Sequence, residues 1–225
     1  MLFFPTEKFY DDFDYFTQIF SKNGYRKILK PETVNTVQDD MSNRLYFIYK
    51  GIIKIVIRNE YCDEKIMVFF REGCVYEDMG LFSELPNPSS SISVTDCEVY
   101  YLNKDKAIEL FLTDSEFALK LMRQACAKHY YTFKRVASIS FLNVEERLTL
   151  LLKSVSDYNT TSQDEWLEPK IKLTHECMSE ILNVNRTTIS RLLCEYYKRG
   201  IIKKQGKKIL FSRKIYEQPS FEETF

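Results

Sequence analysis

The arrangement of hydrophobic and polar positions changes twice along the chain, and each change marks a different kind of structure. Residues 6–22 mix apolar and acidic side chains at helical spacing. Between residues 25 and 102, turn residues separate short runs rich in β-branched and aromatic side chains. The clearest runs cover residues 45–49, 52–57, 66–70, 92–94 and 99–102. Short strands at this close spacing predict an antiparallel sandwich or barrel, with a loop at Pro86–Ser91.

The pattern becomes helical after residue 103. From about 104 to 158 there is no Gly or Pro, and apolar residues recur at steps of three and four. One seam of this kind runs through Phe117, Leu121, Ala125, Lys128, Thr132, Arg135 and Ile139. A helix too long for a small barrel to cover is expected to pair with a second copy along such a seam. The segment Asn143–Glu146 is expected to interrupt the helix, and a second amphipathic helix follows.

A helix–turn–helix pattern lies in the C-terminal part. Thr174 is expected to cap a short helix that ends at Leu182, and Asn183 tolerates the left-handed backbone of a tight turn. Asn185 then caps a second helix. Its inward residues are Ile189, Leu192 and Leu193, and its outward residues are Arg186, Thr187, Ser190 and Arg191. Residues 200–211 read as a basic hairpin, a wing whose Lys203 and Lys207 can meet phosphates. The alternative is an ordinary pair of helices with a solvated face.

Charge is distributed unevenly, although the whole chain has 32 Lys and Arg and 32 Asp and Glu. Residues 170–215 contain twelve Lys or Arg and three Glu, which gives this segment a net charge of +9. Residues 1–169 carry −6. An acidic front and a basic back predict two domains, the second facing a polyanion such as DNA. A solvated lysine face is the alternative explanation.

The sequence contains neither the pattern of a metal site nor that of a membrane-spanning segment. Six cysteines are widely scattered without a C-x-x-C pair, and there are two histidines. This spacing predicts reduced thiols, no metal or other cofactor, and no enzyme activity. The rival class, a cupin-type barrel enzyme, lacks its His-rich metal triad. No run of about 18 uncharged apolar residues occurs, and the N-terminus lacks a basic start and an apolar stretch, so a cytoplasmic protein without membrane contact is expected.

Three segments resemble the Crp/Fnr superfamily. Residues 173–211 are similar to its winged helix, Leu45–Gly51 and Gly80–Phe82 to its sensor β-roll, and Phe141–Leu148 to its hinge. The resemblance implies an α+β fold with an N-terminal double-stranded β-helix, which is a cyclic-nucleotide-binding-like β-roll. A long dimerisation helix and a C-terminal winged helix-turn-helix would follow. The implied domains are residues 1–108 (sensor with N-terminal helix), 109–142 (dimerisation helix) and 143–225 (DNA-binding).

The resemblance also implies a function for the basic segment. Family members regulate transcription as homodimers on palindromic double-stranded DNA, and RNA polymerase is the expected further partner. Residues that read bases would be Arg186, Thr187, Ser190 and Arg191, while Thr174 and His175 would lie where the first helix touches the DNA backbone. Arginine can bond both acceptors on a guanine edge. Thr187 departs from the glutamate common at its position, so a different half-site is expected.

The effector implied by the resemblance is not cyclic AMP. Asp78 can replace the glutamate that holds the ribose, but Glu77 replaces its neighbouring glycine. No arginine occurs between Arg71 and Arg123 to hold the phosphate, and Pro88 lies near the expected place. No cysteine precedes Cys62, which argues against an iron–sulfur sensor, and Cys74 is the one candidate haem ligand in the appropriate region.

A branch of the family that senses chlorinated phenols is also similar, through Phe111–Asn143 and Phe3–Lys8. In that branch a lysine aligned with Lys128 meets the phenolate, so the candidate effector residues are Lys128, Tyr76, Asp78 and Thr132. The alternative for Lys128 is an ion pair with an acid of the sensor domain, or an ammonium that reaches solvent. A regulator switched by cysteine oxidation remains the rival in the same class.

Overall fold

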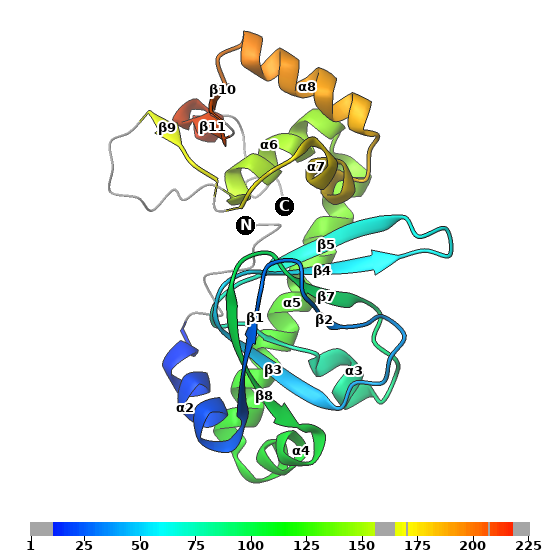
Figure 1. Cartoon of the computed structure of the whole chain (residues 1–225), viewed down its shortest axis with the longest axis vertical. Helices are drawn as coiled ribbons and strands as arrows, with labels where there is room; N and C mark the ends of the chain where they lie inside the picture. Colours follow the sequence, from blue (N-terminus) through cyan, green and yellow to red (C-terminus); the bar gives the residue numbers. More distant parts are fainter. Residues whose placement is uncertain (1–10, 156–164, 170, 207, 218–225) are drawn as a thin grey trace. The chain divides into compact units, whose positions relative to one another are not determined.

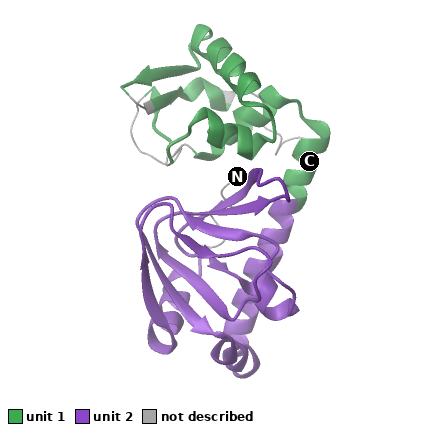
Figure 2. Cartoon of the chain, turned by 45° about the vertical axis from the view of Figure 1, so that its right-hand side comes forward, with its two compact units in different colours: residues 1–3, 133–225 green, residues 4–132 purple. Residues whose placement is uncertain are grey.

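The chain folds into two compact units in a computed structural model that describes residues 11–155, 165–169, 171–206 and 208–217. One unit comprises residues 4–132 and the other comprises residues 133–225 with 1–3 (Figure 2). They are called the sensor unit and the DNA unit after the roles that the sequence predicts for them. The division falls inside the long helix α5 (Ser115–Phe141). The boundary expected after residue 108 lies inside helix α4 (Lys104–Thr113), and the one after residue 142 lies in the break that follows α5.

The sensor unit is a β-roll of two four-stranded antiparallel sheets (Figure 1). The first sheet has the order β1 (Tyr25–Leu29), β8 (Cys97–Asn103), β3 (Arg44–Lys50) and β6 (Val75–Tyr76). The second has the order β2 (Val34–Thr36), β7 (Ser90–Ser93), β4 (Ile53–Arg58) and β5 (Glu64–Phe70). The predicted β-rich runs therefore form the roll, and the structure adds the short strands β1, β2 and β6.

The expected loop at Pro86–Ser91 is wrong at its end, because Ser90 and Ser91 begin strand β7 and pair with β4. Both serines are buried. Their hydroxyl groups are satisfied there: Ser91 Oγ lies 2.6 Å from Thr36 Oγ1, and Ser90 Oγ accepts from the Gln38 amide at 2.9 Å. Hydrogen bonds to neighbouring strands thus let a polar run occupy an interior strand.

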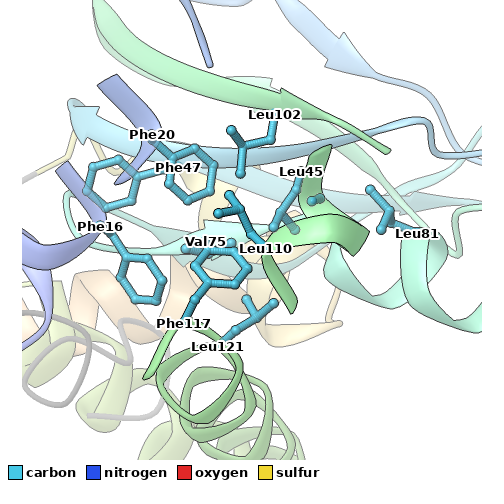
Figure 3. Close-up of a cluster of buried hydrophobic side chains, with 11 residues drawn as sticks. Phe16, Phe20, Leu45, Phe47, Val75, Leu81, Leu102, Leu110, Phe117 and Leu121 are labelled. Carbon is cyan, nitrogen blue, oxygen red and sulfur yellow. The ribbon is translucent and has the colours of Figure 1, made fainter. Parts of the chain in front are cut away.

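The core of the sensor unit lies between the first sheet and its helices (Figure 3). Helix α2 (Phe13–Asn23), α4 and the first half of α5 supply apolar side chains, and α3 (Asp78–Ser83) adds Leu81. The cluster consists of Phe16, Phe20, Leu45, Phe47, Val75, Leu81, Leu102, Ala107, Leu110, Phe117 and Leu121. Phe117 and Leu121 are 0% and 3% exposed, so their assignment to a seam between two copies is wrong. They stabilise the sensor unit itself, each by about 1.5–3 kcal/mol.

The DNA unit begins with the last turns of α5 and continues with α6 (Val144–Val155). Asn143 Oδ1 accepts from the Glu146 amide at 3.0 Å, and Glu146 Oε2 accepts from the Asn143 amide at 2.8 Å. This reciprocal capping box starts a new helix and explains the predicted interruption. Asp114 caps the start of α5 without such reciprocity, because its Oδ1 accepts from the amides of Glu116 and Phe117 while its own amide donates to the Leu110 carbonyl oxygen.

A helix pair and a small sheet complete the DNA unit. The helices are α7 (His175–Leu182) and α8 (Arg186–Lys198), and a 3₁₀ turn covers Arg213–Glu217. The sheet has the order β10 (Ile202–Gln205), β11 (Lys208–Ser212) and β9 (Trp166–Leu167). Strand β9 pairs with β11 through Leu167 and Phe211. Among the described helices, none has both the length and the apolar character that a bilayer crossing requires.

Candidate nucleic-acid interface and effector region

Helix α8 has one buried face and one exposed face. The buried face packs Ile189, Leu192, Leu193 and Tyr196 into the DNA unit, which confirms the predicted inward positions and adds the tyrosine. The exposed face carries Arg186, Thr187, Ser190 and Arg191. Two guanidinium groups and two hydroxyl groups thus project from the first six residues of a helix that the rest of the unit holds firmly.

The turn before α8 has the predicted geometry in two of its three features. Thr174 Oγ1 accepts from the Cys177 amide at 3.1 Å, so Thr174 caps α7 as expected. Asn183 has φ 52° and ψ 52°, the left-handed conformation that asparagine tolerates. Asn185 occupies the N-cap position of α8, but its side chain makes no capping hydrogen bond. The amides at the start of α8 are therefore not satisfied by that side chain.

His175 links the two helices through Ser190. The His175 Nδ1 atom lies 2.9 Å from Ser190 Oγ, and Ser190 Oγ donates to the Arg186 carbonyl oxygen at 3.0 Å. Ser190 thus connects the first residue of α7 with the first turn of α8 on the exposed face.

Helix α6 contacts the buried face of α8 through hydrogen bonds to Tyr196. The Tyr196 hydroxyl group lies 2.7 Å from Thr149 Oγ1 and donates to the Glu145 carbonyl oxygen at 3.2 Å. Burial raises the pKa of Tyr196 above its ordinary value, so the group is a neutral donor. Arg199 at the end of α8 pairs with the Glu145 carboxylate at 2.5 Å, on the surface. These bonds fix the rotation of α8 about its own axis.

The predicted wing is a hairpin of β10 and β11, with Gly206 at φ 61° in its turn. Lys203 is half-buried, and its Nζ lies 4.1 Å from the centroid of the Trp166 ring, a cation–π contact. Lys204 is exposed beside it, and Lys207 lies outside the described residues. Sequence reasoning missed Trp166, because its contact with Lys203 joins positions 37 residues apart and no local pattern signals it.

In the sensor unit, Lys128 of α5 is paired with Asp78 of α3. The Lys128 ammonium group donates to the Asp78 carboxylate and, at 2.9 Å, to the Val75 carbonyl oxygen. The two side chains are 16% and 14% exposed. The Phe70 ring centroid lies 5.9 Å from the Lys128 Nζ. Asp78 is therefore the counter-ion of Lys128 within the chain. Of the four candidate effector residues, the structure brings Lys128 and Asp78 together.

The other two candidates lie differently. Tyr76 is 1% exposed, stacks on Tyr46 with ring centroids 5.1 Å apart, and accepts a hydrogen bond from the Asn35 side chain at 2.9 Å. Burial raises its pKa well above the ordinary value. Thr132 is exposed, and its hydroxyl group donates to the Lys128 carbonyl oxygen at 2.9 Å. Tyr76 thus belongs to the interior of the roll, whereas Thr132 faces outward from α5.

Glu77 occupies an unusual position beside Asp78. Its backbone has φ 71° and ψ 6°, which favours glycine, and its side chain accepts from Thr36 Oγ1 at 2.8 Å. Within the described part of the chain, its Oε2 atom is buried without a hydrogen-bond partner. Burial raises the pKa of this carboxyl group, against the smaller opposing effect of hydrogen bonds from Thr36 and neighbouring side chains.

Replacing Glu77 with glutamine is expected to stabilise the protein at neutral pH. A carboxyl group with a raised pKa binds more protons in the folded state than in the unfolded state, so its contribution to stability falls as pH rises above about 4.5. The gain of the variant over the wild type should shrink as pH falls towards 4.5. Urea unfolding midpoints between pH 4.5 and 7.5 measure this, and a variant less stable than wild type at pH 7 contradicts it.

Cysteine chemistry is restricted by burial. Cys74 and Cys97 are buried, and burial raises the pKa of Cys74 to about 12, so it is a poor nucleophile at neutral pH. Cys62, Cys126 and Cys194 are exposed. Among the described residues, no group of three or more His, Cys, Asp or Glu side chains converges to hold a metal ion.

Comparisons with known proteins agree with this architecture. The family described as the cyclic nucleotide-binding domain matches residues 26–114. The cAMP-activated global transcriptional regulator CRP of Salmonella typhimurium is 25% identical over 177 residues, which cover 77% of this chain and 82% of that protein. The c-di-GMP responsive regulator CLP of Xanthomonas campestris has a similar structure, with a TM-score of 0.77 and 18% identity. The match covers 88% of this chain and 99% of CLP. The structure of CprK complexed with OCPA has a TM-score of 0.66 at 16% identity, and the match covers 90% of this chain and 92% of CprK.

The β-roll, the long helix and the helix-turn-helix with its exposed arginines define a DNA-binding transcription regulator. The matched cyclic nucleotide-binding domain, the similar CRP sequences and the similar solved structures together support a regulator of the Crp/Fnr superfamily. This confirms the predicted family and the predicted α+β fold.

Proposed function

We propose that the protein is a homodimeric transcription regulator that reads a palindromic DNA site with α8 and responds to a small effector other than cyclic AMP. The observation that carries this proposal is the division of α8 into a buried apolar face and an exposed face with Arg186 and Arg191. A helix held in this way can enter the major groove, where arginine bonds the guanine O6 and N7 atoms.

Each polar residue near α8 has a role in this proposal. Arg186, Thr187, Ser190 and Arg191 read base edges. Thr174 and His175, at the start of α7, lie against the DNA backbone. Lys203 and Lys207 of the wing add positive charge near phosphates, in a segment whose net charge is +9. The Ser190 hydroxyl group can donate to a base edge or accept from one, as serine contacts in the major groove commonly do.

The dimer is proposed to form along an apolar row on α5 that the sensor core leaves uncovered. The row has steps of three and four and consists of Leu119, Met122, Cys126, His129, Phe133 and Val136. Phe133 is 72% exposed, and Leu119, Met122 and Val136 are each more than 50% exposed. This alternating spacing fits a left-handed pair of helices, so the proposed occupant is α5 of a second copy. It lies on a different face from the buried Phe117 and Leu121.

Cys126 provides a test of this interface, because a central position in the row places it opposite its own copy. A short bismaleimide is expected to cross-link the wild-type protein into covalent dimers, measured by denaturing gel electrophoresis. Cys126→Ser should abolish the cross-link, whereas Cys62→Ser, which removes another exposed thiol, should not. Cross-linking that persists in Cys126→Ser at the wild-type rate contradicts the interface.

The effector is proposed to bind near Lys128, where a phenolate or similar small anion would replace Asp78 as the counter-ion. Support comes from the half-buried ion pair, from Phe70 beside it, and from the resemblance of α5 to the chlorophenol-sensing branch. Thr132 would contact the effector from the next turn of α5. The lack of arginine between Arg71 and Arg123 argues against a cyclic nucleotide phosphate. The alternative signal, thiol oxidation, would act through the exposed Cys62, Cys126 or Cys194.

A mobility-shift assay on DNA upstream of the protein's own gene tests the proposal. Binding is expected to weaken steeply with salt and to respond to chlorinated phenols but not to cyclic AMP. A response to hydrogen peroxide alone would favour the thiol alternative. Absence of any sequence preference, at every salt concentration and with each candidate effector, would refute the proposed DNA-reading role. RNA polymerase is the proposed partner at the bound promoter, in line with the family.

A further inference from the structure

Two arginines meet at the C-terminal end of α7. Arg135 of α5 donates from Nη2 to the Ile181 carbonyl oxygen at 2.7 Å, and Arg147 of α6 donates from Nη1 to the Leu182 carbonyl oxygen at 3.1 Å. These carbonyl groups belong to the last two residues of α7, directly before the left-handed Asn183. The end of a helix has carbonyl groups without partners in the helix and a partial negative charge, which guanidinium groups complement.

The two contacts join different parts of the DNA unit. Helix α8 is tied to α6 through Tyr196 and Thr149, and the bond from Arg147 ties α6 to α7. Arg147 therefore acts inside a module made of α6, α7 and α8. Arg135 belongs to α5, which ends before the capping box of Asn143. Its hydrogen bond joins the long helix to the module at the turn that leads into α8.

Holding a guanidinium group at this place has a cost. Desolvation, together with repulsion by Arg147, lowers the pKa of Arg135 to about 10. The side chain stays protonated at neutral pH, but a neutral residue would avoid both effects. The stability of the unit therefore does not by itself explain why position 135 is an arginine. The directional hydrogen bond to the Ile181 carbonyl oxygen does explain it.

We propose that Arg135 is a positioning residue that sets the direction of the α7–α8 pair relative to the long helix. In a dimer built on α5, this direction determines the separation of the two recognition helices, and so the spacing of the half-sites that the dimer prefers. Arg135 acts through the Ile181 carbonyl oxygen and the Asn183 turn and does not touch DNA. The inference rests on the proposed dimeric DNA-binding function.

The test compares binding of the full-length protein to four duplexes: one half-site, the palindrome with the preferred spacing, and palindromes one base pair longer or shorter. Arg135→Gln is expected to keep half-site affinity within about twofold of wild type, because α8 itself is unchanged. It should lose about tenfold on the preferred palindrome, the effect of one charge-assisted hydrogen bond. Its preference for that spacing over the altered ones should fall at least about threefold by the same reasoning.

Arg147→Gln is the matched control, since it removes a bond between a guanidinium group and the neighbouring carbonyl inside the module. It is expected to keep the wild-type preference for spacing, whatever it loses in stability. Arg135→Lys, which retains the charge but not the planar fork, should recover part of the preference. Circular dichroism checks folding, and Arg135→Lys serves as the test variant if the glutamine variant does not fold.

Two results would overturn the role of Arg135. One is an unchanged spacing preference in the Arg135 variants. The other is an equal loss of affinity on the half-site and on every palindrome, which is what simple damage to the module would cause. A wild-type protein that binds the palindrome no better than a half-site would refute the proposed dimeric function itself, and the role of Arg135 with it.

Discussion

Replacing Lys128 with methionine is expected to lower the free energy of unfolding by about 3 kcal/mol, because the Asp78 carboxylate would be left half-buried without its counter-ion. Methionine keeps most of the side-chain volume, so the loss measures the charge rather than a cavity. The measurement is urea unfolding at neutral pH, and Asp78→Asn alone should show a smaller loss in the same direction.

The double variant Lys128→Met/Asp78→Asn should recover most of the loss, since no charge remains to be desolvated. Lys30→Met provides the control: the pair of Lys30 with Asp96 is 79% and 69% exposed, and its removal should cost less than about 1 kcal/mol. A double variant as unstable as Lys128→Met would mean that Lys128 stabilises the roll through packing, and a search for an anionic effector at this place would lose its basis.

Replacing Arg191 with alanine is expected to weaken binding to the preferred DNA site by about 1–3 kcal/mol, or roughly 5- to 150-fold, and to relax the choice of base at one position of each half-site. The reason is the loss of a bidentate contact from the exposed face of α8. Fluorescence anisotropy on the preferred site, on each single-base variant of it and on random duplex measures both effects.

Lys204→Ala is the matched control for charge, because Lys204 is exposed on β10 and is expected to contact only phosphate. It should weaken binding to all duplexes by a similar factor and reduce the slope of affinity against salt concentration. Equal losses on the preferred and the random duplex for Arg191→Ala would show that Arg191 contributes charge but does not read bases.

The helix-turn-helix could be predicted from the sequence because its signals are local. The capping residue Thr174, the left-handed Asn183 and the apolar spacing of α8 each act within a few residues, and the structure contains all three. The capping box at Asn143 is of the same kind. Short-range hydrogen bonds with fixed spacing leave a readable pattern.

The errors arise where partners are distant in the chain. Phe117 and Leu121 have the spacing of a seam between helices, yet both belong to the sensor core. Phe117 packs against Phe16 and Phe20 of α2, about a hundred positions earlier in the chain, and periodicity alone cannot assign such a contact. Strand β9 was not predicted because two residues are too few to show the alternating pattern of a strand. Among the described strands it pairs only with β11, which lies about 45 positions later in the chain. The counter-ion of Lys128 lies 50 positions away in sequence.

Lys128 and Arg135 are seven residues apart on one uninterrupted helix. Seven residues make almost two full turns, so the two side chains leave α5 in nearly the same direction, about 10 Å apart along the axis. Each of these cations is bound by an oxygen atom outside α5 and within its own unit: the Asp78 carboxylate for Lys128, and the Ile181 carbonyl group for Arg135.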